Sequence, residues 1–219
     1  ATLVFRYVPA SGAAIRKTFR LSGQSYVMDV AVEAEVKAGE WQELPVVWGP
    51  GLENSINLGV RLTMAPPQLT GMIGGERKEL VFKKVAIPKE GVPEGGVLGS
   101  LDGFFSWVAY ENTYFAAVFR GEKKPLGDVR YQVAENPAEE KAEGEDQTPA
   151  TGTAIPVETR RLSYLSVPGL GAVYLGPKDQ PVLEREGAAH RFVDLDKVIN
   201  YGFGKTFAAW LYKGLDLVH

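Results

Sequence analysis

The sequence contains no cysteine, and this absence excludes two kinds of chemistry. The chain forms no disulfide, and it has no thiolate to act as a nucleophile or as a metal ligand. Cysteine-free chains suit both the reducing cytosol and the oxidising cell envelope. Composition alone therefore leaves the compartment open.

Long apolar runs are also absent. The best candidate, Val97 to Phe119, is interrupted by Asp102, Glu111 and Asn112, whereas a transmembrane helix needs about 18 or more apolar residues. The chain starts at Ala1 without a methionine, and its first residues lack the basic start and apolar core of a signal peptide. We interpret it as a segment of a longer protein that folds in water and has no part within the bilayer.

Histidine is scarce, since only His190 and His219 supply an imidazole. Both lie in the helical tail predicted below, where we expect them to be exposed or locally bonded. Without cysteine, a metal site would need carboxylates gathered around one of them. A Ser-His-Asp triad would need one of them as its base, and the sequence has no Gly-x-Ser-x-Gly turn. We predict no metal site and no acyl-transfer chemistry.

Other catalytic patterns are weak or incomplete. The tripeptide Gly204-Lys205-Thr206 resembles the end of a phosphate-binding loop, but Ile199 stands where that motif requires glycine. A catalytic carboxylate pair stays open on sequence grounds, because its members can lie far apart in the chain. The acids near apolar or turn segments are better explained as turn or capping residues: Glu53, Asp102, Glu111 and Asp179. We therefore predict no catalytic residue and no cofactor site.

Negative charge is concentrated in one stretch. The chain carries a net charge of −3, and the segment from Glu135 to Asp146 has six acids and one lysine, a net of −5, which leaves +2 for the rest. That remainder is too weak a field to attract nucleic acid, so we predict no nucleic-acid partner. The surrounding residues 134–152 are polar, and we predict an acidic mobile insertion there. A solvated loop between two strands is favoured over an acidic docking segment.

Period-two alternation dominates the remaining sequence. From Tyr26 to Val36 the apolar side chains Tyr26, Met28, Val30, Val32 and Val36 alternate with polar ones, which predicts a strand with one buried face. The same pattern recurs in three further sets: Leu3, Phe5 and Tyr7; Ile15, Phe19 and Leu21; and Val129, Tyr131 and Val133. This signature is typical of antiparallel sheets.

One segment departs from the alternation. Residues Tyr114 to Phe119 are apolar at every position, which predicts a central strand covered on both faces. Glycine and proline turns separate the strands, for example at Gly12, Gly74-Gly75 and Pro168-Gly169. Many short strands with such turns favour a sandwich or barrel. At 219 residues, one domain is our starting expectation.

After Tyr174 the spacing of apolar residues changes from alternation to a helical pattern. We expect a short helix from Asp179 to Glu186, with Asp179 as its N-cap and Gly187 as its stop. A second helix is predicted from Asp194 to Val218, because apolar residues recur there at steps of three and four. They are Val198, Ile199, Phe203, Phe207, Trp210, Leu211, Leu215 and Val218.

The four tryptophans have two possible uses. Exposed rings would stack on sugars, whereas buried rings would pack the core, which is the commoner use. We assign Trp107 to the core because it lies within an apolar strand, and we expect Trp48 to pack the turn beside Gly49-Pro50-Gly51. Trp41 and Trp210 are the remaining two.

Several blocks lie in order along nearly the whole chain. They are Lys17-Thr18-Phe19, Ser25 to Val30, Leu44 to Leu52, Trp107-Val108-Ala109, Asn112 to Ala117, Val173 to Asp179 and Val198 to Phe203. Taken together, these blocks resemble the large extracytoplasmic domain of the YidC-type membrane protein insertases. The chain departs from that family in the acidic insertion and in the tail Lys205 to Trp210, where the family more often has a purely apolar stretch with a proline.

The resemblance implies a mainly β fold, a β-supersandwich of two antiparallel sheets with a short C-terminal helical segment. Residues 1–176 would form the sandwich, and residues 177–219 would be the helical segment leading to the next transmembrane helix. It also implies a bacterial inner-membrane protein with this domain on the periplasmic side. The conserved insertase machinery of that family lies in its membrane region, which these residues do not include.

On these grounds we expect a non-catalytic accessory domain, not an enzyme, that supports membrane protein insertion and folding. Its expected partners are accessory subunits of the Sec translocon, nascent membrane proteins and, through the amphipathic last helix, the membrane surface. The alternative for that helix is packing on the sandwich. The candidate contact residues are Phe203, Phe207, Trp210, Leu211 and Leu215.

Two other functions are kept as alternatives. A sheet groove that binds a carbohydrate or another extended ligand rests on fold analogy alone, and a cleft lined by two or more exposed aromatic side chains would favour it. A mutarotase-like enzyme would need a histidine and a carboxylate on the concave sheet. The position of both histidines in the predicted helical tail disfavours it.

Overall fold

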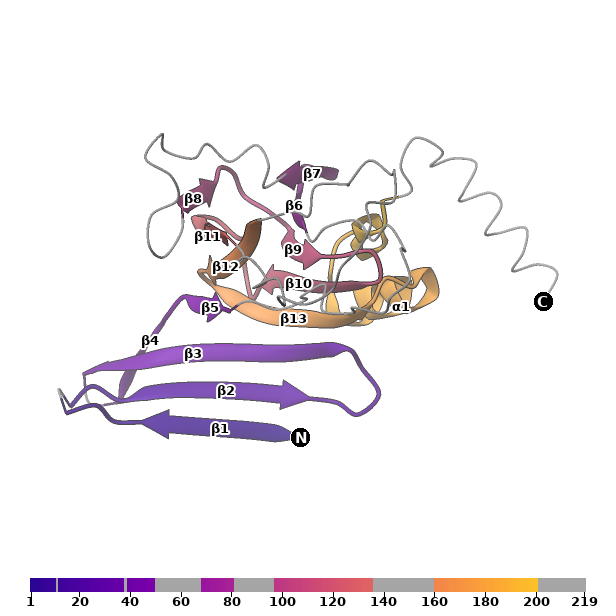
Figure 1. Ribbon diagram of the computed structural model, residues 1–219. Coiled ribbons are helices and arrows are strands. Elements are labelled where there is room, and N and C mark those ends of the chain that lie inside the picture. Colours follow the sequence, from indigo (N-terminus) through magenta and orange to yellow (C-terminus); the bar gives the residue numbers. More distant parts are fainter. Residues whose placement is uncertain (11, 38, 50–67, 81–96, 136–159, 201–219) are drawn as a thin grey trace, which may run out of the picture.

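The computed structural model describes residues 1–10, 12–37, 39–49, 68–80, 97–135 and 160–200. Most of these residues form two antiparallel sheets, which confirms the predicted fold class (Figure 1). Residues 136–159, which make up most of the predicted acidic insertion, lie outside the described residues.

The larger sheet, sheet A, holds nine of the strands in the described ranges. One of them, β4 (Glu40–Glu43), pairs with β3 off the main path. The other strands lie in the spatial order β1 (Thr2–Tyr7), β2 (Ile15–Leu21), β3 (Val27–Lys37), β13 (Leu170–Pro177), β10 (Phe115–Gly121), β9 (Trp107–Glu111), β6 (Gln68–Ile73) and β7 (Glu76–Leu80).

Sheet B is smaller and covers part of one face of sheet A (Figure 1). Its strand β11 continues to Glu135, which pairs with Arg160, so the first two residues of the predicted insertion belong to a strand. The strands of sheet B lie in the order β5 (Val46–Trp48), β12 (Arg160–Val167), β11 (Val129–Glu135) and β8 (Val97–Leu101).

The main core lies between the two sheets. The predicted inward residues of β11, Val129, Tyr131 and Val133, are all buried there, as alternation along a half-covered strand requires. The rings of Trp48 and of Phe119 in sheet A pack in an edge-to-face arrangement, with 5.3 Å between their centroids. This contact therefore spans the two sheets.

A second core lies on the opposite face of sheet A. It is covered by the α-helix α1 (Gln180–His190) and the short 3-10 helix η2 (Leu195–Val198). Trp107 is fully buried in this core, as predicted. The centre of sheet A is thus enclosed between sheet B and these helices.

Strand β10 shows why a segment in this position must be apolar throughout. Ala117 and Phe119 belong to the core under sheet B, whereas Ala116 and Val118 belong to the core under the helices. The prediction of a strand covered on both faces is confirmed for these four residues. It is wrong for Tyr114 and Phe115, which precede the covered part and are exposed.

The turn between β6 and β7 follows directly from its sequence. Gly74 and Gly75 have φ values of 58° and 81°, the left-handed conformations that a two-residue hairpin of the favoured hand requires. Residues other than glycine adopt two successive left-handed conformations only at a steric cost. The predicted Gly-Gly turn is therefore confirmed, and it directs β7 back along β6.

Strands β2 and β3 carry the alternation less evenly than predicted. Val30 and Val32 of β3 are buried, but Val36 is exposed because the strand extends beyond the covered part of sheet A. Val27 is buried on the opposite face of β3, under the helices. The face that was predicted to be polar and exposed is therefore covered at that end of the strand. On β2, Ile15 and Phe19 are half-buried.

The strand predicted around Leu3, Phe5 and Tyr7 is present as β1, but its predicted buried face is wrong. All six residues of β1 are exposed, and these three side chains are 49%, 58% and 64% exposed. The physical reason is position: β1 is the last strand of sheet A, away from both covering layers (Figure 1).

Candidate functional site

The residues predicted to contact membrane or partner, Phe203, Phe207, Trp210, Leu211 and Leu215, lie outside the described residues, as does His219. The structure does describe the chain that leads to them. We call residues 179–200 the exit segment, and its attachment to sheet A is the candidate functional site.

The exit segment begins with a capped helix. Asp179 has an extended backbone and its Oδ1 accepts a hydrogen bond from the Val182 amide at 3.2 Å, which confirms it as the N-cap of α1. The prediction that Gly187 stops the helix is wrong, because α1 continues to His190 and ends at Arg191 in the left-handed conformation.

Gly187 has a packing role instead. A Cβ atom at this position would lie 3.2 Å from Cβ of Leu195 and 3.3 Å from the carbonyl oxygen of Phe192. The missing side chain therefore allows η2 to approach α1 closely. Leu183, Leu195 and Val198 are buried together beneath the two helices.

The predicted continuous helix from Asp194 is wrong at its start. Asp194 is in the left-handed conformation, η2 ends at Val198, and Ile199 is extended with φ −74° and ψ 121°. The spacing of Leu195 and Val198 by three residues fits a 3-10 turn, in which such side chains share a face.

Hydrogen bonds of Trp107, Lys197 and Asn200 hold the later part of the exit segment to sheet A. Trp107 donates from its indole nitrogen to the carbonyl of Val193 at 2.8 Å, on the side of β9. Lys197 donates from Nζ to the carbonyl of Gly75 at 3.1 Å, and Asn200 donates from Nδ2 to Oε1 of Glu79 at 2.7 Å. The described chain therefore ends against the β6–β7 hairpin, at the opposite end of sheet A from β1.

A buried charge lies under this attachment. Glu111 on β9 is 0% exposed, and its carboxylate is 2.6 Å from Nη2 of Arg77 and 2.7 Å from Nζ of Lys178. Thr70 also donates its hydroxyl to Glu111 at 3.0 Å. Two cations are needed here because an unpaired buried carboxylate costs several kcal/mol. The expectation that Glu111 is a turn or capping residue is wrong.

These charges connect the two ends of the exit segment. Lys178 lies directly before Asp179, and Arg77 pairs with Glu79 as well as with Glu111. Glu79 in turn accepts the hydrogen bond from Asn200. We call Lys178, Glu111, Arg77 and Glu79 the charge network. A lone acid at the end of the apolar run from Trp107 was the signal in the sequence, but its partners lie far away in the chain.

A second polar cluster fixes α1 to the start of β3. Glu186 is 2% exposed and accepts a hydrogen bond from the Ser25 hydroxyl at 2.6 Å and from Nη2 of Arg185 at 2.8 Å. Burial acts to raise the pKa of Glu186, but the hydrogen bonds from Ser25 and Arg185 outweigh it and the pKa is lowered. Glu186 thus stays ionised at neutral pH.

His190 joins this cluster without forming a catalytic relay. Its Nε2 lies 3.0 Å from Oγ of Ser25 and 3.6 Å from Oε2 of Glu186. In a Ser-His-Asp triad the acid binds the ring nitrogen that faces away from the serine. Here one nitrogen faces both groups, so the arrangement attaches the helix. Its bond to Ser25 joins residues distant in the sequence, in contrast to the expected local bond or exposure.

The neighbouring Tyr174 completes the contact. Burial, followed by the negative charge of Glu186, raises the pKa of Tyr174 above its usual value, so its hydroxyl stays protonated. It donates a hydrogen bond to the carbonyl of Pro177, close to the start of the exit segment. This bond holds the connection between β13 and α1.

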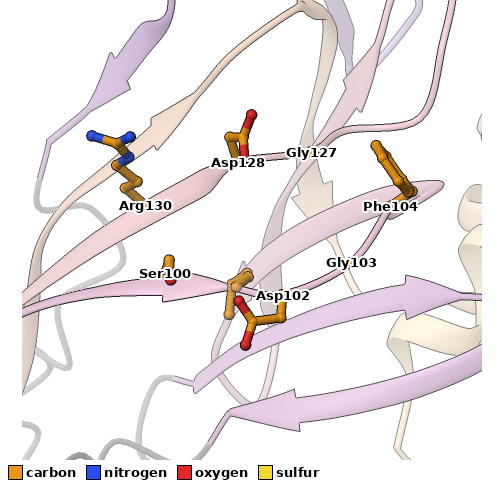
Figure 2. Close-up of a pocket in the computed structure, with 8 residues that line it drawn as sticks. Ser100, Asp102, Gly103, Phe104, Gly127, Asp128 and Arg130 are labelled. Carbon is orange, nitrogen blue, oxygen red and sulfur yellow. The ribbon is translucent and has the colours of Figure 1, made fainter.

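A shallow pocket of about 520 Å³ lies on sheet B at the ends of β8 and β11. Figure 2 shows Ser100 and Arg130 on neighbouring strands, Asp102 and Asp128 near the strand ends, and Phe104 after Gly103. Phe104, 74% exposed, is the single aromatic residue of its lining. The pocket therefore lacks the paired aromatics that would favour a glycan site. Asp102 lies in the connection after β8 and is exposed, as a turn residue would be.

The described residues contain neither a metal-binding cluster nor a helix that could span a membrane. No group of three or more histidines, cysteines or acids is placed to hold a metal ion in the part of the chain that the structure describes. None of the helices within those same ranges has the length and hydropathy that crossing a membrane requires.

Comparison with known proteins gives a consistent result. The family model for the YidC periplasmic domain matches residues 1–214. The chain is similar to the membrane protein insertase YidC of Anaeromyxobacter dehalogenans (strain 2CP-C), with 31% identity over 209 residues, which covers 92% of this chain and 32% of that protein. The protein of the same name from Anaeromyxobacter sp. (strain K) is 30% identical over the same coverage. The chain thus spans about a third of the length of these relatives.

The charge network predicts a specific loss of stability. Replacing Glu111 by alanine should lower the free energy of unfolding by about 3–5 kcal/mol, because Lys178 would lose its acidic partner in a largely buried place and Arg77 would keep only Glu79. Urea denaturation at neutral pH measures this value. Glu111→Gln, which keeps the side-chain shape, should lose less unfolding free energy than the alanine variant. It replaces the alanine variant in the measurement if that variant does not fold.

Glu33→Ala is the matched control. Its carboxylate pairs with Arg16 at 2.9 Å, but both side chains are partly exposed, so the loss should not exceed about 1 kcal/mol. Equal losses for Glu33→Ala and Glu111→Ala would contradict the structural role assigned to the charge network.

Proposed function

The chain belongs to the YidC periplasmic domain family, and from this premise we propose that it is the non-catalytic extracytoplasmic domain of an inner-membrane protein insertase. In this proposal the domain faces the periplasm and supports the insertion and folding of membrane proteins. The observation that carries the proposal is the attachment of the exit segment, which fixes where the chain leaves sheet A.

The attachment of the exit segment defines where the chain leaves sheet A. Residues that continue from Asn200 start at a defined point beside the β6–β7 hairpin, because Asn200 is bonded to Glu79 and Lys197 to Gly75. Buried Leu195 and Val198 resist detachment, since exposing each apolar side chain costs about 1.5–3 kcal/mol. The described chain is thereby held to the sandwich up to Asn200.

The segment after Asn200 is the proposed contact with the membrane surface. Phe203, Phe207, Trp210, Leu211 and Leu215 recur at helical spacing, while Lys205 and Lys213 fall on the other side. Aromatic rings suit the boundary between head groups and acyl chains, and lysines keep their charges in water. The same side chains are proposed to contact accessory subunits of the Sec translocon or nascent membrane proteins.

The non-catalytic part of the proposal is supported by the geometry at His190. Its ring shares one nitrogen between Ser25 and Glu186, so neither group is activated by the other through the imidazole. The buried Glu111 is neutralised by two cations, which suits a structural role better than proton transfer.

Binding of the 219-residue chain to liposomes that contain anionic lipid tests the membrane contact. Phe207→Ser combined with Trp210→Ser should weaken binding by roughly tenfold or more, because two apolar side chains no longer enter the interface. Phe104→Ser is the matched control, since it removes a 74% exposed aromatic ring at the sheet B pocket and should leave binding unchanged. If the double variant binds as well as the unaltered chain, the membrane contact is wrong.

The protein partners are tested in cells with the full-length protein. A photo-reactive amino acid at position 210 should form adducts with a translocon subunit or a nascent chain, whereas the same group at position 104 should form few. Adducts at position 104 equal to those at position 210, or none at position 210, would contradict the assignment of partner contact to the tail.

A further inference from the structure

The edge of sheet A at β1 is apolar, and none of the described strands covers it. All six residues of β1 are exposed, among them Leu3, Val4, Phe5 and Tyr7, which are 49–64% exposed. Edge strands of this kind offer a template for pairing with another chain, and proteins commonly protect them with charges or prolines. Thr2–Tyr7, which we call the β1 edge, contains neither proline nor any charged residue except Arg6.

The backbone of the β1 edge is arranged for strand addition. The Ala1 nitrogen donates to the Leu21 carbonyl at 2.6 Å and the Leu21 amide donates to the Ala1 carbonyl at 2.8 Å, so these two residues form a hydrogen-bonded pair. Alternation along an antiparallel ladder then directs the amide and carbonyl groups of Val4 and Arg6 outward. Among the described strands, none pairs with β1 on that side.

The side chains continue the apolar face that sheet B covers farther along sheet A. Leu3 lies opposite Phe19 in the register, and Phe5 packs against Phe19 edge to face with ring centroids 6.0 Å apart. Phe19 in turn lies opposite Val30, which is buried in the main core. A strand added beside β1 would therefore place alternate side chains against this apolar surface.

The positive charge of the first two strands favours an acidic partner at the β1 edge. Residues 1–21 contain four basic side chains and no acid. Arg6 is 63% exposed and lies 3.8 Å from Glu35, a separation at which an exposed ion pair contributes little. A second copy of the chain would place a second Arg6 at the edge, with its basic strand β2 next to it, which disfavours self-pairing. A lipid surface would leave the outward amides and carbonyls without partners, which is costly in an apolar medium.

We propose that the β1 edge is a strand-addition site for an extended polypeptide segment in which apolar side chains alternate with acidic ones. The main chain of the partner would pair with the outward groups of Val4 and Arg6, its apolar side chains would cover Leu3, Phe5 and Tyr7, and an acid would pair with Arg6. The site lies at the opposite end of sheet A from the β6–β7 hairpin, where the exit segment ends (Figure 1), so it does not depend on the function proposed above.

A fluorescent nine-residue peptide that alternates valine and glutamate is the test ligand, with a valine–lysine peptide as its charge-reversed control. Fluorescence anisotropy with the 219-residue chain should show binding of the acidic peptide and much weaker binding of the basic one. Val4→Pro should weaken binding of the acidic peptide by roughly tenfold or more, because it removes an outward backbone amide that would pair with the peptide. The fold should tolerate this proline, because that amide pairs with no described strand and edge strands accept proline at such positions.

Two further variants keep the result interpretable. Val4→Thr retains the amide and should bind within about twofold of the unaltered chain, which separates backbone pairing from general damage. Arg6→Glu should reverse the preference between the two peptides, and it serves if Val4→Pro does not fold by circular dichroism.

Equal binding of the acidic peptide to the Val4→Pro and unaltered chains would overturn the proposal, as would equal affinity for both peptides. Failure of the peptide to bind would also overturn it. In that case, self-association in sedimentation velocity would indicate a second copy as occupant, and binding to phosphatidylglycerol vesicles lost on Phe5→Ser would indicate a lipid surface.

Discussion

Strands β9, β10 and β13 must be apolar on both faces, because one face lies against sheet B and the other against the exit segment. On β10, Phe119 enters the first core and Val118 enters the second. Neither layer can leave without exposing apolar surface, at about 25 cal/mol per Å². This double coverage ties the exit segment to the sandwich, and the charge network around Glu111 adds a specific attachment at the margin of the second core.

The two ends of sheet A differ because the coverage is confined to its centre. At the β6–β7 end, the hairpin receives Lys197 and Asn200 and anchors the chain before it continues. At the β1 end, neither layer reaches the strand, and Phe5 is left exposed. One sheet thus offers an internal attachment at one edge and an open edge at the other. Under the two proposals made above, orientation of the domain and contact with further polypeptides would use opposite edges of this sheet.

The sequence predicted those features that depend on local pattern. Alternation gave β3, the apolar run gave the doubly covered centre of β10, and the side chain of Asp179 gave the N-cap of α1. Predictions from the sequence were wrong where contacts between distant residues determine the structure. Gly187 is a common helix stop, but here it makes room for Leu195, and a step of three or four residues cannot distinguish the 3-10 turn at Val198 from an α-helix.

The candidate site was hidden for the same reason. Glu111 stands out as a lone acid after an apolar run, but the sequence does not identify its partners, because Arg77 and Lys178 reach it from parts of the chain far away. The exposure of β1 was also not predictable, since alternation shows that a strand has an apolar face but not whether another layer covers it. The membrane contacts of Phe203, Phe207, Trp210, Leu211 and Leu215 stay predictions.

Native-state hydrogen exchange tests the central claim, that the exit segment is held to the sandwich as part of one cooperative unit. The amides of Leu183, Phe192 and Ile199, which are hydrogen-bonded within the segment, should exchange with opening free energies close to those of β10. Exchange at these amides that is orders of magnitude faster than in β10 would show that the segment detaches independently, and the account would be wrong.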